Sequence, residues 1–426
     1  MPPIEDHPLR FSLVNELHAR PFPVLTAPCR AAYLAIKPKT DAANRDREAD
    51  REHLIALLDR YGAPHPQPDA THYFGDIGDH RLKWESHTEF VTYSIFGDGT
   101  SDRPFDAQTF DLFPEGWLAD APGVRIASIL IRVELYGDDA AITDKIGRWF
   151  VTESRTVSRV LDDSAVIAGD FRLDPAGHMR FAVFARADAG ARRVGRIVQR
   201  LCEIETYKTM SMLGLTRARA LEPKMGNIDG RLTKLMGEMS GDDARPEATL
   251  EGLLEVSSEL ENILTQSSFR FGATRAYGAL VNQRAAVLGE DRFEGGQTLS
   301  EFMARRFAPA MRTVSSTEAR LNALAERAMR AGELLRTRVD VERSNQNQAV
   351  LKSMDHRAGL QLNLQRTVEG FSVAAISYYA VNLLSYMAYP AIEPLGLSKG
   401  WTTAIITPFV IVLVFVVIRR MRDRPD

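Results

Sequence analysis

Cysteine is scarce in this chain of 426 residues, which contains only Cys29 and Cys202 and no CxxC pair. That scarcity argues against a disulfide scaffold and favours a reducing compartment. An excess of charge is also missing, because 53 Lys and Arg residues face 56 Asp and Glu residues. The resulting net charge of -3 lacks the basic signature of a nucleic-acid-binding protein, so no nucleic-acid partner is expected.

The common motifs of soluble enzymes are absent as well. The sequence has no P-loop, no GxGxxG after a predicted strand, no HExxH, no GxSxG and no kinase motif set. No nucleophile and base lie at a diagnostic spacing. We therefore do not expect an enzyme.

Long hydrophobic runs are missing from the first 367 residues, but two such runs occupy 368–388 and 401–418. Each has about the length that a helix needs to cross the hydrocarbon core of a bilayer. The mean hydropathy of the whole chain is still -0.20, so the remainder is distinctly polar. The sequence predicts a water-facing body attached to the lipid bilayer by two transmembrane helices.

The charges around these spans predict an orientation. Residues 1–10 lack a basic region followed by an apolar one, so no secretory signal is expected. The external loop 389–400 holds only Glu393 and Lys399 as charged residues, whereas the tail 419–426 is basic. Positive charge on the tail side predicts a bacterial inner-membrane protein with both termini in the cytoplasm.

Composition divides the body into three parts. Residues 1–190 alternate helical stretches with runs of β-type residues, which predicts an α+β cytoplasmic domain whose sheet carries helices on one side. Residues 191–300 predict a helical hairpin, with helices at 191–221 and 248–288. Residues 301–367 predict a stalk helix that continues into the first span, because 310–389 contain no proline.

The stalk carries a seam of apolar residues at alternating steps of three and four, which is typical of coiled coils. It begins with Leu321, Leu324, Ala328, Ala331 and Leu335. It turns polar at Arg338, Glu342 and Asn345, and it continues through Leu351, Met354, Ala358, Gln361, Gln365 and Val368. Two arrangements fit this pattern: a helix packed on its own chain's hairpin, or several stalks around a wet axis with Gln361 and Gln365 at its cytoplasmic mouth.

Two polar clusters in the body are candidate sites. Glu16, His18 and Arg20 lie at a predicted helix end, where Glu16 and Arg20 form either a structural ion pair or part of a partner or ligand site. Within a single predicted strand over 81–96, the alternation of side chains would place Glu85, His87 and Glu89 on one face. That face is either an ordinary solvated surface or a site for a ligand or a divalent cation.

The third cluster lies in the first span, where Tyr378, Asn382, Ser385 and Tyr386 are predicted to share one helix face with Tyr389. Polar side chains at membrane depth avoid lipid and face protein or water. They either form hydrogen bonds between helices of an oligomer or line an ion path.

The chain resembles an uncharacterised bacterial family of membrane-anchored proteins with a domain of unknown function. The resemblance rests on the strings 14–21 (VNELHARP), 84–90 (WESHTEF) and 169–172 (GDFR), followed by two C-terminal spans. It implies no activity.

The order of parts is also similar to the CorA-type magnesium and zinc transport family, which forms pentamers with the first span lining the pore. That family carries Gly-Met-Asn at the external end of this span, whereas residues 386–390 here read Tyr-Met-Ala-Tyr-Pro. The sequence therefore leaves two hypotheses: a membrane-anchored homo-oligomer with a ligand- or partner-binding cytoplasmic domain, or a divergent CorA-like divalent-cation channel.

Overall fold

The computed structural model describes residues 4–11, 13–14, 21–40, 44–68, 70–106, 110–239, 246–392 and 399–422. The chain divides into two compact units. The first, called the body, comprises Met1–Asp243 and Glu251–Ala331. The second, called the helical unit, comprises Ala244–Leu250 and Gly332–Asp426.

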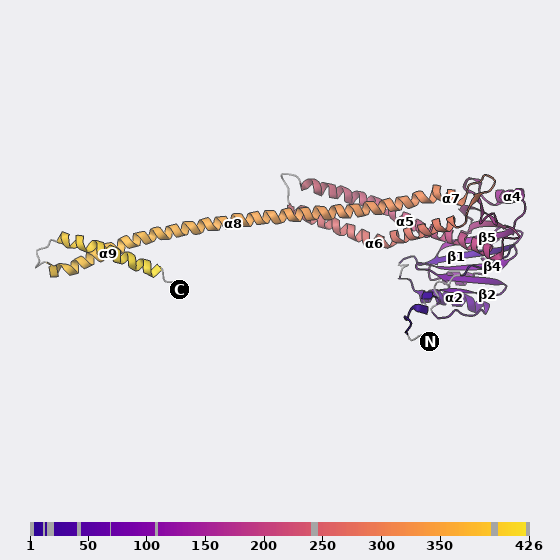
Figure 1. The fold of residues 1–426 in the computed structure, drawn as a ribbon, viewed down its shortest axis with the longest axis horizontal. Helices are drawn as coiled ribbons and strands as arrows, with labels where there is room; N and C mark the ends of the chain where they lie inside the picture. Colours follow the sequence, from indigo (N-terminus) through magenta and orange to yellow (C-terminus); the bar gives the residue numbers. More distant parts are fainter. Residues whose placement is uncertain are drawn as a thin grey trace. The chain divides into compact units, whose positions relative to one another are not determined.

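A nine-stranded sheet forms the centre of the body (Figure 1), with the strand order β2-β3-β4-β1-β5-β8-β7-β6-β9. Neighbouring strands are antiparallel except β5 and β8, which pair in parallel. The strands are β1 (Cys29–Lys37), β2 (His72–Ile77), β3 (His80–Ser86), β4 (Val91–Asp98), β5 (Val124–Leu135), β6 (Thr156–Val160), β7 (Ala165–Leu173), β8 (Met179–Ala185) and β9 (Asp291–Arg292).

The helices within residues 1–190 cover one face of the sheet, as predicted for that part of the chain, and two helices from beyond residue 190 cover the other face. Strand β1 is therefore buried on both faces, because its alternate side chains enter different cores. Ala31 and Tyr33 pack with helix α5 (Ala191–Glu238) and helix α6 (Pro246–Ala286). Leu34 and Ile36 pack with helix α2 (Arg47–Tyr61) and helix α3 (Glu115–Ala119). Helix α4 (Asp139–Trp149) packs on strands β6 to β8.

Helix α5 runs through Pro223 to Glu238, well beyond its predicted end at residue 221. A proline inside a helix removes a backbone hydrogen bond, but Leu221, Met225 and Ile228 are fully buried on either side of it. This tertiary packing overrides the local preference to stop. Helix α6 lies so close to α5 that a Cβ on Gly214 would be 2.2 Å from Thr274 Oγ1.

Helix α7 (Leu299–Phe302) begins with a capping box, in which Thr298 and Glu301 bond to each other's backbone N–H groups. A π-helical turn (Met303–Phe307) then leads into helix α8 (Ala308–Ile392). Within the body, the first part of the predicted seam is buried, and Arg327 of α8 pairs with Asp229 of α5 at 3.0 Å.

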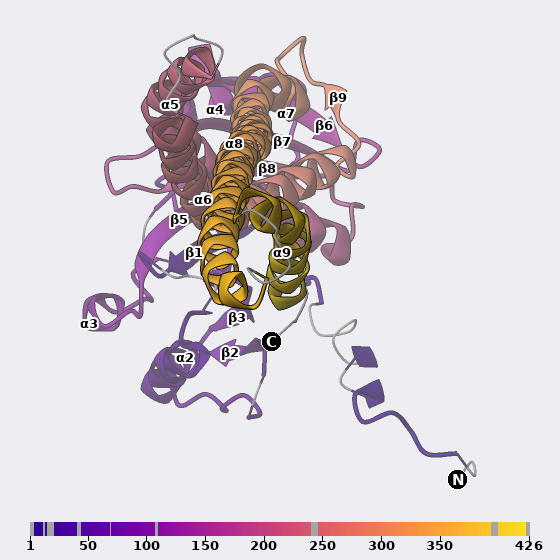
Figure 2. The same ribbon diagram turned by 90° about the vertical axis from the view of Figure 1, so that its left-hand side faces the viewer.

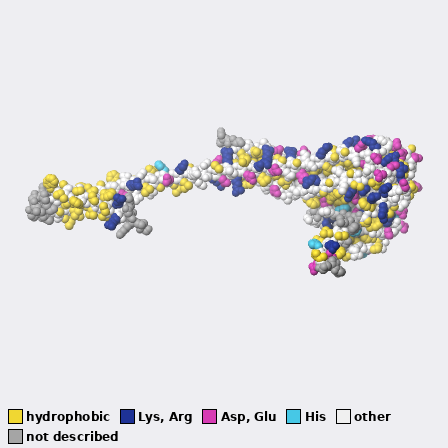
Figure 3. Space-filling model, viewed as in Figure 1, with side chains coloured by type: hydrophobic (Ala, Val, Ile, Leu, Met, Phe, Trp, Pro, Cys, Tyr) yellow, Lys and Arg dark blue, Asp and Glu magenta, His cyan; other side chains and the backbone are white. Residues whose placement is uncertain are grey.

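In the helical unit, helix α9 (Lys399–Arg422) returns beside the end of α8 (Figures 1 and 2). Ser377, Val381 and Ser385 are buried on α8 at steps of four, and Thr402 and Val410 are buried on α9. Thr403 Oγ1 donates a hydrogen bond of 3.4 Å to Ser385 Oγ. Hydrophobic side chains gather over the outer surface of this helix pair (Figure 3). By length and composition, α8 and α9 can each cross a membrane.

Candidate functional site

The site begins at the hairpin between β3 and β4, where the predicted single strand over 81–96 was wrong. Strand β3 ends at Ser86, and the backbone N–H of His87 donates to the carbonyl of Phe90 at 2.9 Å to close a tight turn. Arg45 holds this turn from outside, because its Nη2 donates to Ser86 Oγ at 2.8 Å and to the carbonyl of His87. Glu85 therefore lies on a strand, whereas His87 and Glu89 lie in the turn.

The three predicted side chains have separate partners. Glu85 pairs with Lys83 at 3.3 Å on the same strand face. Glu89 pairs with Arg270 of α6, and it is only 1% exposed. His87 stacks on Phe90 with 4.4 Å between ring centroids. Across the described parts of the chain, no group of three or more His, Cys, Asp or Glu residues is placed to hold a metal ion.

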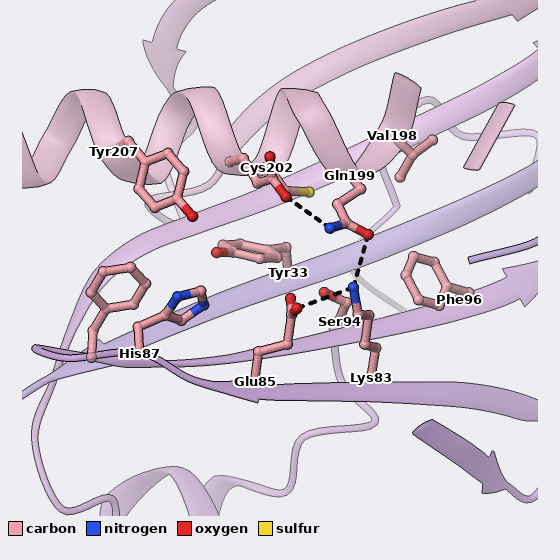
Figure 4. A pocket seen from close by; sticks show the side chains of 12 residues that line it. Tyr33, Lys83, Glu85, His87, Ser94, Phe96, Val198, Gln199, Cys202 and Tyr207 are labelled. Carbon is pink, nitrogen blue, oxygen red and sulfur yellow. Dashed lines mark hydrogen bonds and ion pairs between the residues drawn. The ribbon is translucent and has the colours of Figure 1, made fainter. Parts of the chain in front are cut away.

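A small polar cavity, called the inner pocket, lies between the sheet and α5 beside this hairpin (Figure 4). Its volume of about 20 Å³ has room for about one water molecule. Its walls come from β1, β3, β4, the hairpin turn and α5. They are Tyr33, Lys83, Glu85, His87, Phe90, Ser94, Phe96, Val198, Gln199, Cys202, Glu203 and Tyr207.

A chain of polar contacts crosses the inner pocket from the sheet to the helices. Lys83 Nζ is buried and donates a hydrogen bond of 2.8 Å to Gln199 Oε1. Gln199 Nε2 donates in turn to Glu203 Oε1 at 2.7 Å. The other oxygen of Glu203 accepts from Arg284 of α6. Lys83 is the buried end of this chain of contacts, whereas the side chains of Glu203 and Arg284 are 18% and 30% exposed.

Two further groups of the inner pocket, Cys202 and Tyr33, are held in neutral forms. Burial raises the pKa of the Cys202 thiol, so the thiolate needed for nucleophilic attack does not form near neutral pH. Burial also raises the pKa of Tyr33 well above its ordinary value, although its hydroxyl oxygen accepts a hydrogen bond of 2.9 Å from Thr206. These groups suit the binding of a ligand better than covalent catalysis.

A second and larger cavity, called the vestibule, shares His87 and Tyr207 with the inner pocket. Its volume is about 480 Å³, and its other walls are Arg47, Thr71, Ser86, Thr88, Tyr277 and Leu280. Tyr207 and Tyr277 stack with 5.7 Å between ring centroids. His87 and Tyr207 thus line both a small chamber with charged walls and a space large enough for a metabolite.

The other predicted site residues are not part of this pair of cavities. Glu16, His18 and Arg20 lie outside the described residues. Gln361 and Gln365 are exposed on α8.

The predicted polar face of the first span is divided among different environments. Ser385 is buried and bonds to Thr403 of α9. Tyr378 and Tyr386 are 67% and 66% exposed, and Asn382 is half-buried. Lys399 Nζ lies 4.7 Å from the centroid of the Tyr386 ring. The helix pair therefore shelters only part of this face within one chain.

Sequence reasoning missed Lys83, Gln199, Glu203, Tyr207 and Arg270 as site residues. A signal was available for two of them, because Gln199 and Glu203 lie four residues apart and so share a helix face. Their meeting with Lys83 depends on a contact across 116 residues of chain, which no local pattern shows.

The comparisons with known proteins give one match. A family described as "Protein of unknown function (DUF3422)" matches residues 5–425, nearly the whole chain. Neither a curated protein nor a solved structure matches the chain. The resemblance to an uncharacterised family is thereby confirmed, and the resemblance to CorA-type transporters finds no support.

Proposed function

Because the chain belongs to the DUF3422 family, which carries no assigned activity, we propose a function from geometry: a membrane-anchored oligomeric protein whose body binds a small polar ligand. The observation that carries the proposal is the inner pocket with its vestibule. A buried ammonium and two carboxylates meet there around a neutral amide, next to a larger cavity with an aromatic wall. Perturbed, buried polar groups in a cavity are typical of binding sites.

The membrane anchor in this proposal is the α8–α9 pair. Its outer surface is apolar, and Trp401 and Tyr386 are exposed near Lys399 at one end of the pair. Arg419 and Arg420 lie exposed at the other end of α9. Aromatic residues with a lysine at one end and arginines at the other fit the two interfaces of a bilayer. The basic end of α9 favours a cytoplasmic tail in the inner membrane.

Self-association completes the proposal. All residues of α8 from 343 to 368 are exposed in the single chain, among them Leu351, Met354 and Val368 of the predicted seam. A helix in a protein gains most of its stability by packing its apolar face against another surface. We therefore expect a second copy of α8 to pack on this seam.

A divalent-cation channel is the second candidate, favoured by the half-buried Asn382 between the exposed Tyr378 and Tyr386. In an oligomer, such as a pentamer of the CorA type, these groups would line a polar path. Liposomes containing the full chain would then show magnesium flux, and Asn382→Leu would abolish it. Flux no greater than in empty liposomes would rule the channel out.

The ligand-binding proposal is tested with the full chain in lipid nanodiscs. The protein is incubated with a defined mixture of amino acids, amides and small carboxylates, separated by size, and the retained compounds are identified by mass spectrometry. We expect retention by the natural sequence and by Lys352→Met on α8, and loss in Lys83→Met. Retention no greater than by empty nanodiscs, or equal retention by folded Lys83→Met, would contradict the proposal.

A further inference from the structure

The side chain of Gln199 lines the inner pocket and extends from α5 toward Lys83 on the sheet (Figure 4). Its amide oxygen accepts from Lys83 Nζ at 2.8 Å, and its amide nitrogen donates to Glu203 Oε1 at 2.7 Å. The cation and the anion thus each bond to one end of the same neutral group. With this amide in place, the free volume of the pocket is only about 20 Å³.

The two partners dictate which chemical group fits between them. A lysine ammonium can only donate hydrogen bonds, and an ionised carboxylate can only accept them. A carboxylate placed between them would face Glu203, and also Glu85, which lies 3.3 Å from Lys83. An ammonium placed there would face Lys83. A carboxamide or a ureido group satisfies both partners because it carries an acceptor oxygen and a donor nitrogen.

We propose that the inner pocket binds the carboxamide or ureido group of a small metabolite, which takes the place of the Gln199 side chain. This inference rests on the proposed ligand-binding function and names the chemical class of the ligand. Gln199 acts as an internal stand-in that keeps Lys83 and Glu203 satisfied when no ligand is bound. Without it, the buried Lys83 would lose its amide acceptor and keep Glu85 at 3.3 Å, while Glu203 would keep Arg284, and a hydrogen bond lost at a buried charge is costly.

The surroundings of the pocket supply a place for the rest of the molecule. The vestibule meets the inner pocket at His87 and Tyr207, so a ligand head in the pocket places its remainder beside these rings. Hydroxyls of Thr71, Ser86 and Thr88 line the vestibule with Arg47. The tail of the ligand is therefore polar, and it stacks against aromatic rings rather than entering an apolar core.

Three fragments of equal size test the inference: propionamide, propionate and propylammonium. Their binding to the full chain in nanodiscs is measured by ligand-observed NMR titration. We expect propionamide to bind about ten- to a hundredfold more tightly than either charged fragment, because each charged fragment leaves one buried partner unsatisfied. Gln199→Ala, which removes the competing amide, should strengthen propionamide binding. Lys352→Met on α8, which lines neither cavity, should leave it unchanged.

A second variant changes the preference instead of removing the site. In Glu203→Gln one carboxylate becomes an amide that can donate, while Glu85 stays in place, so the preference for propionamide over propionate should become smaller. Tighter binding of a charged fragment to the natural sequence, or an unchanged preference in a folded Glu203→Gln, would overturn the inference. No fragment binding, with a compound of another class retained in the metabolite assay, would overturn it and leave the proposed function standing. Failure of both assays would overturn both.

Discussion

Charged side chains are usually exposed and large apolar side chains are usually buried, and the body and the helical unit depart from this rule in opposite ways. Around the β3–β4 hairpin, Lys83, Glu85 and Glu89 are charged yet 3%, 8% and 1% exposed, and each has a partner within the same unit. Along α8, Leu351 and Leu364 are apolar yet 64% and 66% exposed. The body thus pairs the buried charges of this hairpin internally, whereas the helical unit leaves large apolar side chains uncovered within one chain.

The largest expected effect lies at the buried ion pair between Glu89 and Arg270. Glu89→Ala leaves the guanidinium of Arg270, which is 16% exposed, without its carboxylate. We expect the free energy of unfolding to fall by about 3–5 kcal/mol. Denaturant unfolding of the full chain in detergent, followed by the fluorescence of Trp84, Trp117 and Trp149, measures the loss.

The same experiment with a double variant distinguishes the lost partner from the lost volume. Arg270→Met combined with Glu89→Leu removes both charges, so most of the stability should return. A double variant as unstable as Glu89→Ala would mean that packing, and not charge pairing, holds this part of the body together.

The next effect is steric and lies between the two long helices of the body. In Gly214→Ala the new Cβ meets Thr274, and we expect a loss of about 1–3 kcal/mol. Gly226 lies on the same helix, and a Cβ added there would meet no atom within 4 Å, so Gly226→Ala should gain about 0.5–1 kcal/mol. Opposite signs in thermal unfolding of this matched pair support the close packing of α5 on α6, and equal signs contradict it.

Local patterns predicted most strands of the body because runs of β-type residues are separated there by Gly, Asp and Pro. They failed at the β3–β4 turn, which has no Gly or Pro between Trp84 and Val91 and is held instead by Arg45. The inner pocket could not be predicted, since Lys83 and Gln199 meet only after the sheet and α5 have packed. In the helical unit, by contrast, the two apolar runs were plain from the sequence because membrane-length hydrophobicity is a local property.

The body should also lose stability in mild acid, because His53 is buried in a neutral form. Its Nε2 donates to the carbonyl of Trp117 at 2.9 Å, and its Nδ1 accepts from Tyr93 Oη at 3.0 Å. Burial lowers its pKa below the ordinary value of about 6.5. The stabilisation of the body by neutral His53 is therefore fully present above pH 6.5. It is lost as the pH falls toward the lower pKa of the folded state, at no more than about 1.4 kcal/mol per pH unit.

Unfolding measured from pH 7.5 down to pH 5 checks this direction. Burial lowers the pKa of His80 and His178 in the same sense, so His53→Gln should reduce the pH slope without abolishing it. A slope that is unchanged in His53→Gln would show that His53 does not contribute.

The smallest effect on the chain itself is expected from single cysteines on the exposed part of α8. Leu351→Cys and Ala358→Cys lie on the predicted seam, and His356→Cys lies on the opposite side of the same helix turn. Each position is exposed, so each change should alter stability by less than about 0.5 kcal/mol.

Cys29 and Cys202 are buried and should not react. Mild oxidation in membranes should link Leu351→Cys and Ala358→Cys into dimers far faster than His356→Cys, because facing seam positions in parallel helices approach to disulfide distance. Equal rates on the two sides would mean that another surface covers the seam, and the contrast between a self-sufficient body and a dependent helical unit would then have to be explained by the bilayer alone.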